Sequence, residues 1–252
     1  MKNEPFLILG GDSRLAKGFQ KLYPSMTTLL SKNECNILDE KSIRKAFKKY
    51  TNKYVINCAA ITDMSYCEEN PKECIAINAF GPYLLNTISK EFNKKLIHIS
   101  SDYASANSNI YGLSKYISEK MIDTEMLIIR TNFYDEKTFI VKELLENRTI
   151  ETYTNIFFNP ISINNLVTEI IAKKNTRGLI NIFTDKKISF FTFASLVSSI
   201  FDKKISLIRK TSYQNNNANP YRLLSSYVKP DITVNIEDDL LAFKDYIRYA
   251  NN

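Results

Sequence analysis

Three side chains with the types and spacing needed for proton transfer lie between positions 101 and 115. Ser101 ends an apolar stretch, and Tyr111 and Lys115 follow it as i and i+4 of a predicted helix, which places both on one face. An ammonium beside a phenol favours the phenolate, so Lys115 is expected to lower the pKa of Tyr111 toward neutrality. The Ser101 hydroxyl would orient a carbonyl or alcohol for proton exchange. The pattern predicts redox chemistry on a C–O group, with hydride from a cofactor.

The same spacing has an ordinary explanation. A tyrosine and a lysine four residues apart are common by chance, and both can lie on the surface of an amphipathic helix. The function therefore depends on what the rest of the chain places around Ser101, Tyr111 and Lys115.

A nucleotide-binding turn is predicted near the N-terminus. Phe6 to Leu9 is a short apolar run, and Gly10 and Gly11 precede a predicted helix start. A strand, a tight turn and a helix N-terminus together can hold a pyrophosphate. Ser13 and Ala16 stand where a dinucleotide-binding fingerprint has glycines, although the Ser13 hydroxyl could donate to a phosphate. The alternative is a plain strand, turn and helix.

The second predicted strand, residues 26–30, is followed by Ser31 and Lys32 rather than by an acid. An acid at this place usually binds the ribose 2′-hydroxyl of NAD, whereas basic and hydroxyl groups suit a 2′-phosphate. Together with Arg14, these residues favour NADP(H) over NAD(H). A solvated loop lysine at position 32 is the alternative.

Apolar strands at 54–57, 96–100 and 126–129 continue the alternation of strands and helices. This order predicts an α/β protein with a Rossmann-type, doubly wound parallel sheet, whose ligands bind beyond the carboxyl ends of the strands. Asp39 and Asn70 are expected to cap the next two helices. Asn78 lies inside the second of these, either as a buried hydrogen-bonding residue or as a site residue.

Residues 1–131 are predicted to form the dinucleotide-binding core, joined by a returning strand near 178–183. Residues 132–252 are expected to form mainly a small substrate-binding lobe, with helices at 136–147, 164–173, 190–201 and 236–249.

The composition narrows the class of protein. The chain has 252 residues and a net charge of +7, with lysines scattered rather than clustered, which predicts an anionic ligand but no nucleic-acid surface. Its four cysteines form no C-x-x-C pair and it has one histidine, so no metal site is expected. Free thiols without a recognisable signal peptide fit the cytoplasm, and no run is long enough to span a membrane.

Several segments in this order resemble a known family: residues 7–16, 36–39, 55–62, 78–82, 98–103, 111–115, 130–131, 159–162 and 178–182. The chain is similar to the extended short-chain dehydrogenase/reductases, and within them to sugar-nucleotide reductases of the dTDP-4-dehydrorhamnose reductase type. The resemblance covers nearly the full length. It is more specific for the family than for one substrate.

The resemblance implies roles for individual residues. Tyr111 would protonate the C4 oxygen of a keto sugar, Lys115 would hold the nicotinamide ribose, and Ser101 would bind the substrate oxygen. Gly10, Ser13, Arg14 and Leu15 would line the pyrophosphate, Asn36 and Ile37 the adenine, and Cys58, Ala59, Ala60 and Thr62 the middle of the cofactor. Asp102, Tyr103, Asn132 and Arg222 would contact the substrate together with Ser101.

The implied function is an NAD(P)H-dependent reductase of a nucleotide-linked 4-keto sugar in surface polysaccharide synthesis, such as O-antigen or capsule. A homodimer is common among such relatives. Two alternatives stay open: a non-catalytic or regulatory member that keeps the fold, and a reductase or epimerase of another small substrate. Asn36 replaces the family's usual Asp, and the segment between Ser101 and Tyr111 is short, which predicts a more open substrate pocket.

Overall fold

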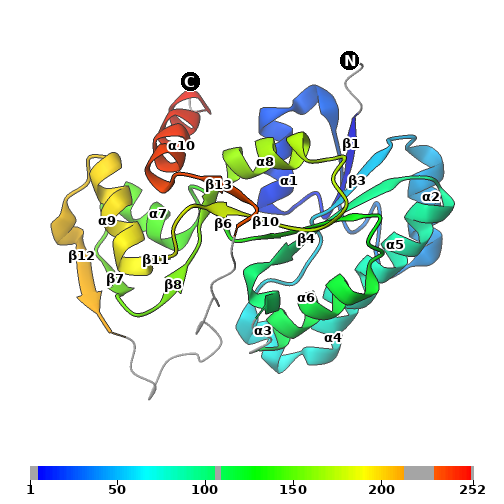
Figure 1. The fold of residues 1–252 in the computed structure, drawn as a ribbon, viewed down its shortest axis with the longest axis horizontal. Helices are drawn as coiled ribbons and strands as arrows, with labels where there is room; N and C mark the ends of the chain where they lie inside the picture. The colour runs from blue at the N-terminus through cyan, green and yellow to red at the C-terminus, as the bar shows by residue number, and fades with distance from the viewer. Residues whose placement is uncertain (1–4, 106–108, 213–229, 251–252) are drawn as a thin grey trace. The chain divides into compact units, whose positions relative to one another are not determined.

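The computed structural model of the protein describes residues 5–105, 109–212 and 230–250, and in this part of the chain seven strands form the central sheet (Figure 1). Their spatial order is β13-β10-β5-β4-β3-β1-β2. They are β1 (Phe6–Leu9), β2 (Thr27–Leu30), β3 (Tyr54–Asn57), β4 (Lys95–Ser101), β5 (Leu127–Thr131), β10 (Gly178–Thr184) and β13 (Ile232–Val234). The pairs β1–β2, β1–β3, β3–β4 and β10–β13 are parallel. The predicted Rossmann-type sheet and its returning strand are confirmed.

Helices alternate with these strands. They are α1 (Arg14–Leu22), α2 (Glu40–Lys49), α3 (Met64–Glu69), α4 (Pro71–Ile75), α5 (Gly81–Glu91), α6 (Ile110–Met121), α7 (Phe139–Leu145), α8 (Ile163–Ala172), α9 (Phe190–Ile200) and α10 (Ile236–Ala250). Shorter turns are η1 (Pro24–Met26), η3 (Asp102–Ser105) and η4 (Ile205–Leu207), and a π-helical segment, η2 (Ala76–Phe80), joins α4 to α5. No helix among the described residues is long and apolar enough to cross a membrane.

Two helix starts differ in detail from the expectation. Asn70 stands at the N-cap position of α4, before Pro71, as predicted, but its side chain makes no capping hydrogen bond, and its Nδ2 donates to the carbonyl oxygen of Tyr66. The helix expected from residue 136 begins only at Phe139, since the Asp135 carboxylate accepts from the backbone of Lys137 and holds a turn there. Asp39 does cap α2, and its Oδ1 accepts from the Lys41 amide at 2.9 Å.

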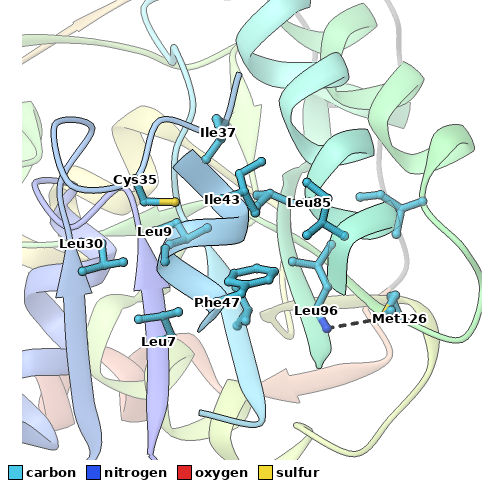
Figure 2. Packing of buried hydrophobic residues seen from close by; sticks show 14 of the residues in the cluster. Leu7, Leu9, Leu30, Cys35, Ile37, Ile43, Phe47, Leu85, Leu96 and Met126 are labelled. Atoms are coloured by element: carbon cyan, nitrogen blue, oxygen red, sulfur yellow. Dashed lines mark hydrogen bonds between the residues drawn. The ribbon is translucent and has the colours of Figure 1, made fainter. Parts of the chain in front are cut away.

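Apolar side chains cover both faces of the sheet. On one face Leu7, Leu9 and Leu96 pack against Phe47 of α2 and Leu85 of α5 (Figure 2). The opposite face carries aromatic rings, which include Phe6, Tyr54 and Phe19 of α1. Because successive residues of a strand point to opposite faces, a strand buried on both sides reads as a continuous apolar run.

The chain divides into two compact units. Unit 1 contains Met1–Arg130 and Val167–Ile180, and unit 2 contains Thr131–Leu166 and Asn181–Asn252. Unit 2 is held together by a buried carboxylate: Asp239 accepts hydrogen bonds from Tyr134 at 2.8 Å, from the Ser162 hydroxyl at 2.5 Å and from Asn165 at 2.6 Å. Three pairs of short strands, β6 (Phe133–Tyr134) with β9 (Ile161–Ser162), β7 (Ile150–Tyr153) with β12 (Ile208–Thr211) and β8 (Phe157–Phe158) with β11 (Ile188–Ser189), complete the strands described.

The order of the first three strands creates a switch point in unit 1. The chain runs from β1 to β2 on one side and then crosses to β3 on the other side of β1. Leu9 is level with both Leu30 and Asn57, so the three strands end together. Ligands of open α/β sheets bind beyond the carboxyl ends of strands at such a reversal.

A buried polar chain ties α6 to the sheet beside this point. The Ser118 hydroxyl donates to the Lys115 carbonyl oxygen at 2.6 Å, so it accepts from His98 Nε2 at 3.0 Å. The unprotonated Nδ1 of His98 then accepts from Asn57 Nδ2 at 3.2 Å, and Asn57 Oδ1 accepts from the Ala59 amide. One tautomer of a neutral imidazole satisfies every partner. Burial, and secondarily the Lys115 charge, hold the pKa of His98 well below its ordinary 6.5.

This neutral histidine makes stability depend on pH. Below pH 6.5 the unfolded chain takes up a proton at His98 that the folded chain does not, so the free energy of unfolding falls as pH falls. The slope attributable to His98, the chain's one histidine, is expected to reach about 1.4 kcal/mol per pH unit. Urea unfolding of wild type and His98→Gln at several pH values measures it, since Gln keeps a neutral donor and acceptor. Parallel curves for the two proteins would contradict a buried neutral imidazole.

Candidate active site

A cavity of about 290 Å³ lies in unit 1 at the carboxyl ends of β1, β2 and β3. Its walls come from the segments that follow these three strands and from η2, so it occupies the switch point of the sheet. Its lining residues are Gly10, Asp12, Ser13, Lys32, Cys35, Asn36, Ile37, Leu38, Cys58, Ala59, Ala60, Ile61 and Ile77. The cavity combines an apolar wall with a few polar groups, as sites for nucleotides and other small molecules do.

Gly10 allows the first and third of these segments to meet. Its φ is +75°, and an added Cβ would lie 2.6 Å from the Ala59 backbone nitrogen. No other residue type fits this conformation and this approach. The glycine fingerprint, in which Ser13 and Ala16 replace two glycines, therefore keeps Gly10, the position where the backbone requires a glycine.

The N-terminus of α1 faces the cavity through Ser13. The Ser13 hydroxyl oxygen accepts from the Ala16 amide at 3.2 Å, which makes Ser13 the N-cap, and the first turn of this nine-residue helix contains no acid. The N–H groups of this first turn and the helix dipole suit a phosphate. Ser13 thus serves the helix itself, a role that the comparison with glycine fingerprints did not predict.

The segment after β2 carries opposite charges, of which only Lys32 lines the cavity. Lys32 lines the cavity, whereas Ser31 is turned to Glu34, whose carboxylate accepts from the Ser31 amide and hydroxyl at 2.9 Å each. The hydrogen bond from the Ser31 amide lowers the pKa of Glu34, so the carboxylate is charged at neutral pH. Sequence reasoning missed Glu34 because it lies three residues beyond the place where a ribose-binding acid is expected.

The predicted cofactor residues divide into two groups. Gly10, Ser13, Lys32, Asn36, Ile37, Cys58, Ala59 and Ala60 line the cavity, whereas Arg14, Leu15, Ser31, Thr62 and Lys115 are not among its lining residues. The Leu15 side chain is only 2 % exposed in the core, so only its backbone is available to a ligand. The cavity also includes Asp12, Cys35, Leu38, Ile61 and Ile77, which sequence reasoning missed. All of these except Ile77 adjoin a predicted cofactor residue in the sequence, and this adjacency was the signal that could have found them.

Ser101 and Tyr111 come together beside the end of β4. Tyr111 is 8 % exposed, and the Ser101 side chain lies near enough to oppose the rise that burial causes in the pKa of Tyr111. Ser101 Oγ also donates to Asp102 Oδ1 at 3.0 Å and accepts from the Tyr103 amide at 3.3 Å. These bonds hold the Ser101 hydroxyl at the start of η3, where the strand turns toward α6.

Gly112 brings α6 against this turn. A Cβ at Gly112 would lie 2.6 Å from the Tyr103 carbonyl oxygen, and the Gly112 amide donates to Asn109, the N-cap of α6. The Tyr103 and Tyr111 rings pack edge to face, with centroids 5.9 Å apart. The short connection is therefore closed by backbone contact between η3 and the first turn of α6.

The electrostatics differ from the sequence prediction. Burial, the largest cause, raises the pKa of Tyr111, and the nearby Asp102 raises it further, so the expectation of a pKa lowered toward neutrality was wrong for the protein without a cofactor. Lys115 is 3 % exposed, and its Nζ donates to the Ile99 carbonyl oxygen at 2.9 Å. Burial lowers the pKa of Lys115 to about 8. At neutral pH the phenol is protonated and most of the lysine is charged.

Asn78 connects the cavity wall to α6. Its Oδ1 accepts from the Ile61 amide at 2.8 Å, and its Nδ2 donates to the Ile61 carbonyl oxygen at 2.8 Å and to Ser114 Oγ at 3.1 Å. Asn78 is fully buried in the π-helical segment η2. Pro82 lacks the N–H that would bond to the Asn78 carbonyl oxygen in a regular α-helix, which explains the wider turn here. Asn78 is thus a buried hydrogen-bonding residue that fixes a cavity-lining segment.

The predicted substrate residues are placed only in part. Asp102 and Tyr103 adjoin Ser101 in η3 of unit 1, where Asp102 is 2 % exposed. Asn132 belongs to unit 2. Arg222 lies outside the described residues, as do residues 106–108 of the short segment before Tyr111. Within the described ranges no group of three or more potential metal ligands occurs.

Similarity to known proteins extends over most of the chain. The family model described as "RmlD substrate binding domain" matches residues 5–226. A spore coat polysaccharide biosynthesis protein of Bacillus subtilis is 31 % identical over 121 residues, covering 41 % of this chain and 43 % of that protein. A dTDP-4-dehydrorhamnose reductase of Mycolicibacterium smegmatis is 31 % identical over 126 residues, 44 % of this chain and 36 % of that protein. The chain spans less than half the length of these curated relatives.

Solved structures show the same fold over nearly the whole chain. A dTDP-4-dehydrorhamnose reductase of Clostridium acetobutylicum has a TM-score of 0.81 at 20 % identity, covering 97 % of this chain and 99 % of that one. The Bacillus anthracis protein of the same name, solved in complex with NADP, has a TM-score of 0.81 at 21 % identity, covering 96 % and 98 %. At these identities the likeness establishes the fold.

The contact at Gly112 predicts an unusual effect of alanine in a helix. Gly112→Ala would ordinarily stabilise a helix by about 1 kcal/mol. Here the new methyl group meets backbone at 2.6 Å, so we expect a net loss of roughly 1–3 kcal/mol in the free energy of unfolding. Urea unfolding measures this loss. Lys120→Ala, at an exposed position of the same helix, serves as the control and should change stability by less than about 0.5 kcal/mol. A more stable Gly112→Ala protein would mean that α6 does not approach η3 this closely.

Proposed function

This chain belongs to the RmlD substrate binding domain family, and from that membership we propose that it is an NAD(P)H-dependent reductase of a nucleotide-linked 4-keto sugar. Relatives named dTDP-4-dehydrorhamnose reductase and spore coat polysaccharide biosynthesis protein support this class of substrate and a role in surface polysaccharide synthesis. The cytoplasm is the proposed location of the reaction, where four free thiols stay reduced.

The observation that carries the proposal is the position of α6 beside the cavity wall. Burial raises the pKa of the cavity-lining Cys58, and the charge of Lys115 on α6 lowers it. Tyr111 stands one turn earlier on the same helix, where the Ser101 side chain acts on its pKa. The cavity would take the dinucleotide, with the N-terminus of α1 at the pyrophosphate and Ile37 and Leu38 against the adenine. The absence of an acid from the first turn of α1 and the small residues 58–60 fit such a ligand.

The residues divide the chemistry among them. A nicotinamide cofactor held in the cavity would supply the hydride for the sugar carbon. Tyr111 donates the proton to the carbonyl oxygen, and its raised pKa keeps that proton in place at neutral pH until the oxygen becomes basic. The Ser101 hydroxyl orients the same oxygen. Lys115 would bind the nicotinamide ribose, and its charge would stabilise the phenolate that Tyr111 becomes.

For the cofactor we propose NADP(H). Lys32 lies in the cavity wall where a 2′-phosphate would be bound, and the relative from Bacillus anthracis was solved with NADP. Glu34 opposes this preference through its negative charge, although its carboxylate is engaged by Ser31. The balance of Lys32 and Glu34 would set how strongly NADPH is preferred over NADH.

A non-catalytic member is the second candidate. It is favoured by the capping role of Ser13 in place of a glycine and by the short segment before Tyr111, which would leave a more open substrate pocket. Such a protein would bind a nucleotide through the same cavity without turning over a keto sugar. Activity against sugar nucleotides separates it from the reductase.

Removing the phenol tests the assignment of Tyr111. Tyr111→Phe keeps the ring and its packing but has no proton to donate, so turnover is expected to fall by roughly 10²–10⁴-fold. Tyr116→Phe, on the same helix and outside the site, is the matched control. Steady-state turnover and NADPH titration are measured for both. An equal loss of turnover and cofactor affinity in Tyr111→Phe would count against a proton donor, because the phenol would then be binding the cofactor.

Neutralising Lys32 tests the cofactor preference. Lys32→Gln removes the charge facing a 2′-phosphate, so the Kd for NADPH is expected to rise about tenfold while that for NADH stays nearly constant. Lys41→Gln, an exposed residue on α2 that makes the same change in net charge, is the control. If the affinities for NADPH and NADH fall equally, or if neither falls, Lys32 does not bind the 2′-phosphate.

A further inference from the structure

Two buried cysteines touch each other beside Tyr111. Cys67 lies in α3 and Cys74 in α4, both with no exposed surface, and their Sγ atoms are 2.8 Å apart. Together with Tyr111 they form a separate buried cluster of unit 1. The proposed reduction uses neither thiol, so the close contact of the two sulfurs calls for another explanation.

The geometry is close to that of a disulfide. A disulfide bond is about 2.05 Å long, so the sulfurs need to approach by less than about 1 Å. The two helices are short, with six and five residues, and Asn70 between them has a non-helical backbone. A small adjustment at this joint would supply the movement.

The thiols also contact groups that shape the site. Cys67 Sγ donates to the Ile61 carbonyl oxygen at 3.8 Å, and Ile61 lines the cavity. Cys74 Sγ accepts from Asn78 Nδ2 at 3.4 Å and lies 3.6 Å from Ser114 Oγ. A disulfide would remove both S–H donors and alter the packing against the Tyr111 ring. Oxidation of the pair would thereby change the surroundings of the proton donor, Tyr111, and of the cavity wall at Ile61.

We propose that Cys67 and Cys74 are a modification site, a dithiol that hydrogen peroxide oxidises reversibly to an intramolecular disulfide. One thiolate attacks a peroxide oxygen, which breaks the O–O bond and gives a sulfenic acid and hydroxide. The second sulfur then displaces the sulfenic hydroxyl and forms the S–S bond. The thiol protons convert the two leaving hydroxides to water, so two thiols and one peroxide give one disulfide and two waters.

Burial sets the rate of this reaction. Burial raises the pKa of Cys67, and hydrogen bonding and charge at Cys74 raise it further. The thiolate is therefore scarce until α3 and α4 open locally, as short helices do at low cost. Oxidation is expected to be slow at neutral pH and to accelerate as pH rises.

The chemical test uses the full chain and does not depend on the proposed function. After peroxide treatment, intact mass should fall by about 2 Da, and peptide mapping without reductant should join the peptides of Cys67 and Cys74. Dithiothreitol should reverse both changes. The proposal is overturned if the mass rises by oxygen additions instead, if both residues remain thiols, or if either pairs with Cys35 or Cys58.

A kinetic test rests on the proposed function. Oxidised wild type should lose turnover and regain it with dithiothreitol, whereas Cys67→Ser, compared with its own untreated form, should show no such reversible loss. A reversible loss that persists in Cys67→Ser would assign it to another thiol and overturn the effect on the site. If the reduced protein has no turnover at all, the proposed function fails, and the mass measurement on wild type still decides the fate of the dithiol.

Discussion

The structure of the site depends on one backbone contact, the approach of the first turn of α6 to η3. Only a glycine at position 112 allows it, because a Cβ there would meet the Tyr103 carbonyl oxygen at 2.6 Å. The contact closes the short connection from Ser101 to Tyr111 and brings a hydroxyl at a strand end to a phenol at a helix start. Lys115 lies on the same helix, and its Nζ donates to the Ile99 carbonyl oxygen.

Buried hydrogen bonds join α6 to two neighbouring segments and stabilise this geometry. His98 links α6 to the segment that begins at Asn57, and Asn78 links α6 to Ile61 in the cavity wall. Buried polar groups are costly unless fully bonded, so satisfied networks of this kind favour one arrangement of the elements they join. The cavity and the proposed proton donor are therefore parts of one framework in unit 1, and a change in either is expected to affect the other.

The sequence predicted the fold better than the electrostatics. Continuous apolar runs separated by helical segments are a strong signal for a parallel sheet buried on both faces. The segments after β1, β2 and β3 line the cavity, and β4 ends at Ser101. The pKa of Tyr111 was predicted in the wrong direction because spacing reveals a neighbouring charge but not the depth of burial. The contact of Cys67 with Cys74 could not be predicted from the sequence either. It depends on the backbone at Asn70 between α3 and α4, where the side chain makes no capping hydrogen bond.

The central claim is that this framework delivers hydride and proton to a sugar carbonyl. Its most direct test is incubation of the chain with NADPH carrying deuterium at C4 of the nicotinamide and a dTDP-linked 4-keto-6-deoxy sugar. Mass spectrometry and NMR of the sugar nucleotide should find one deuterium bonded to sugar C4. If neither NADPH nor NADH yields a deuterated sugar while the protein binds the cofactor, the account of a reductase is contradicted.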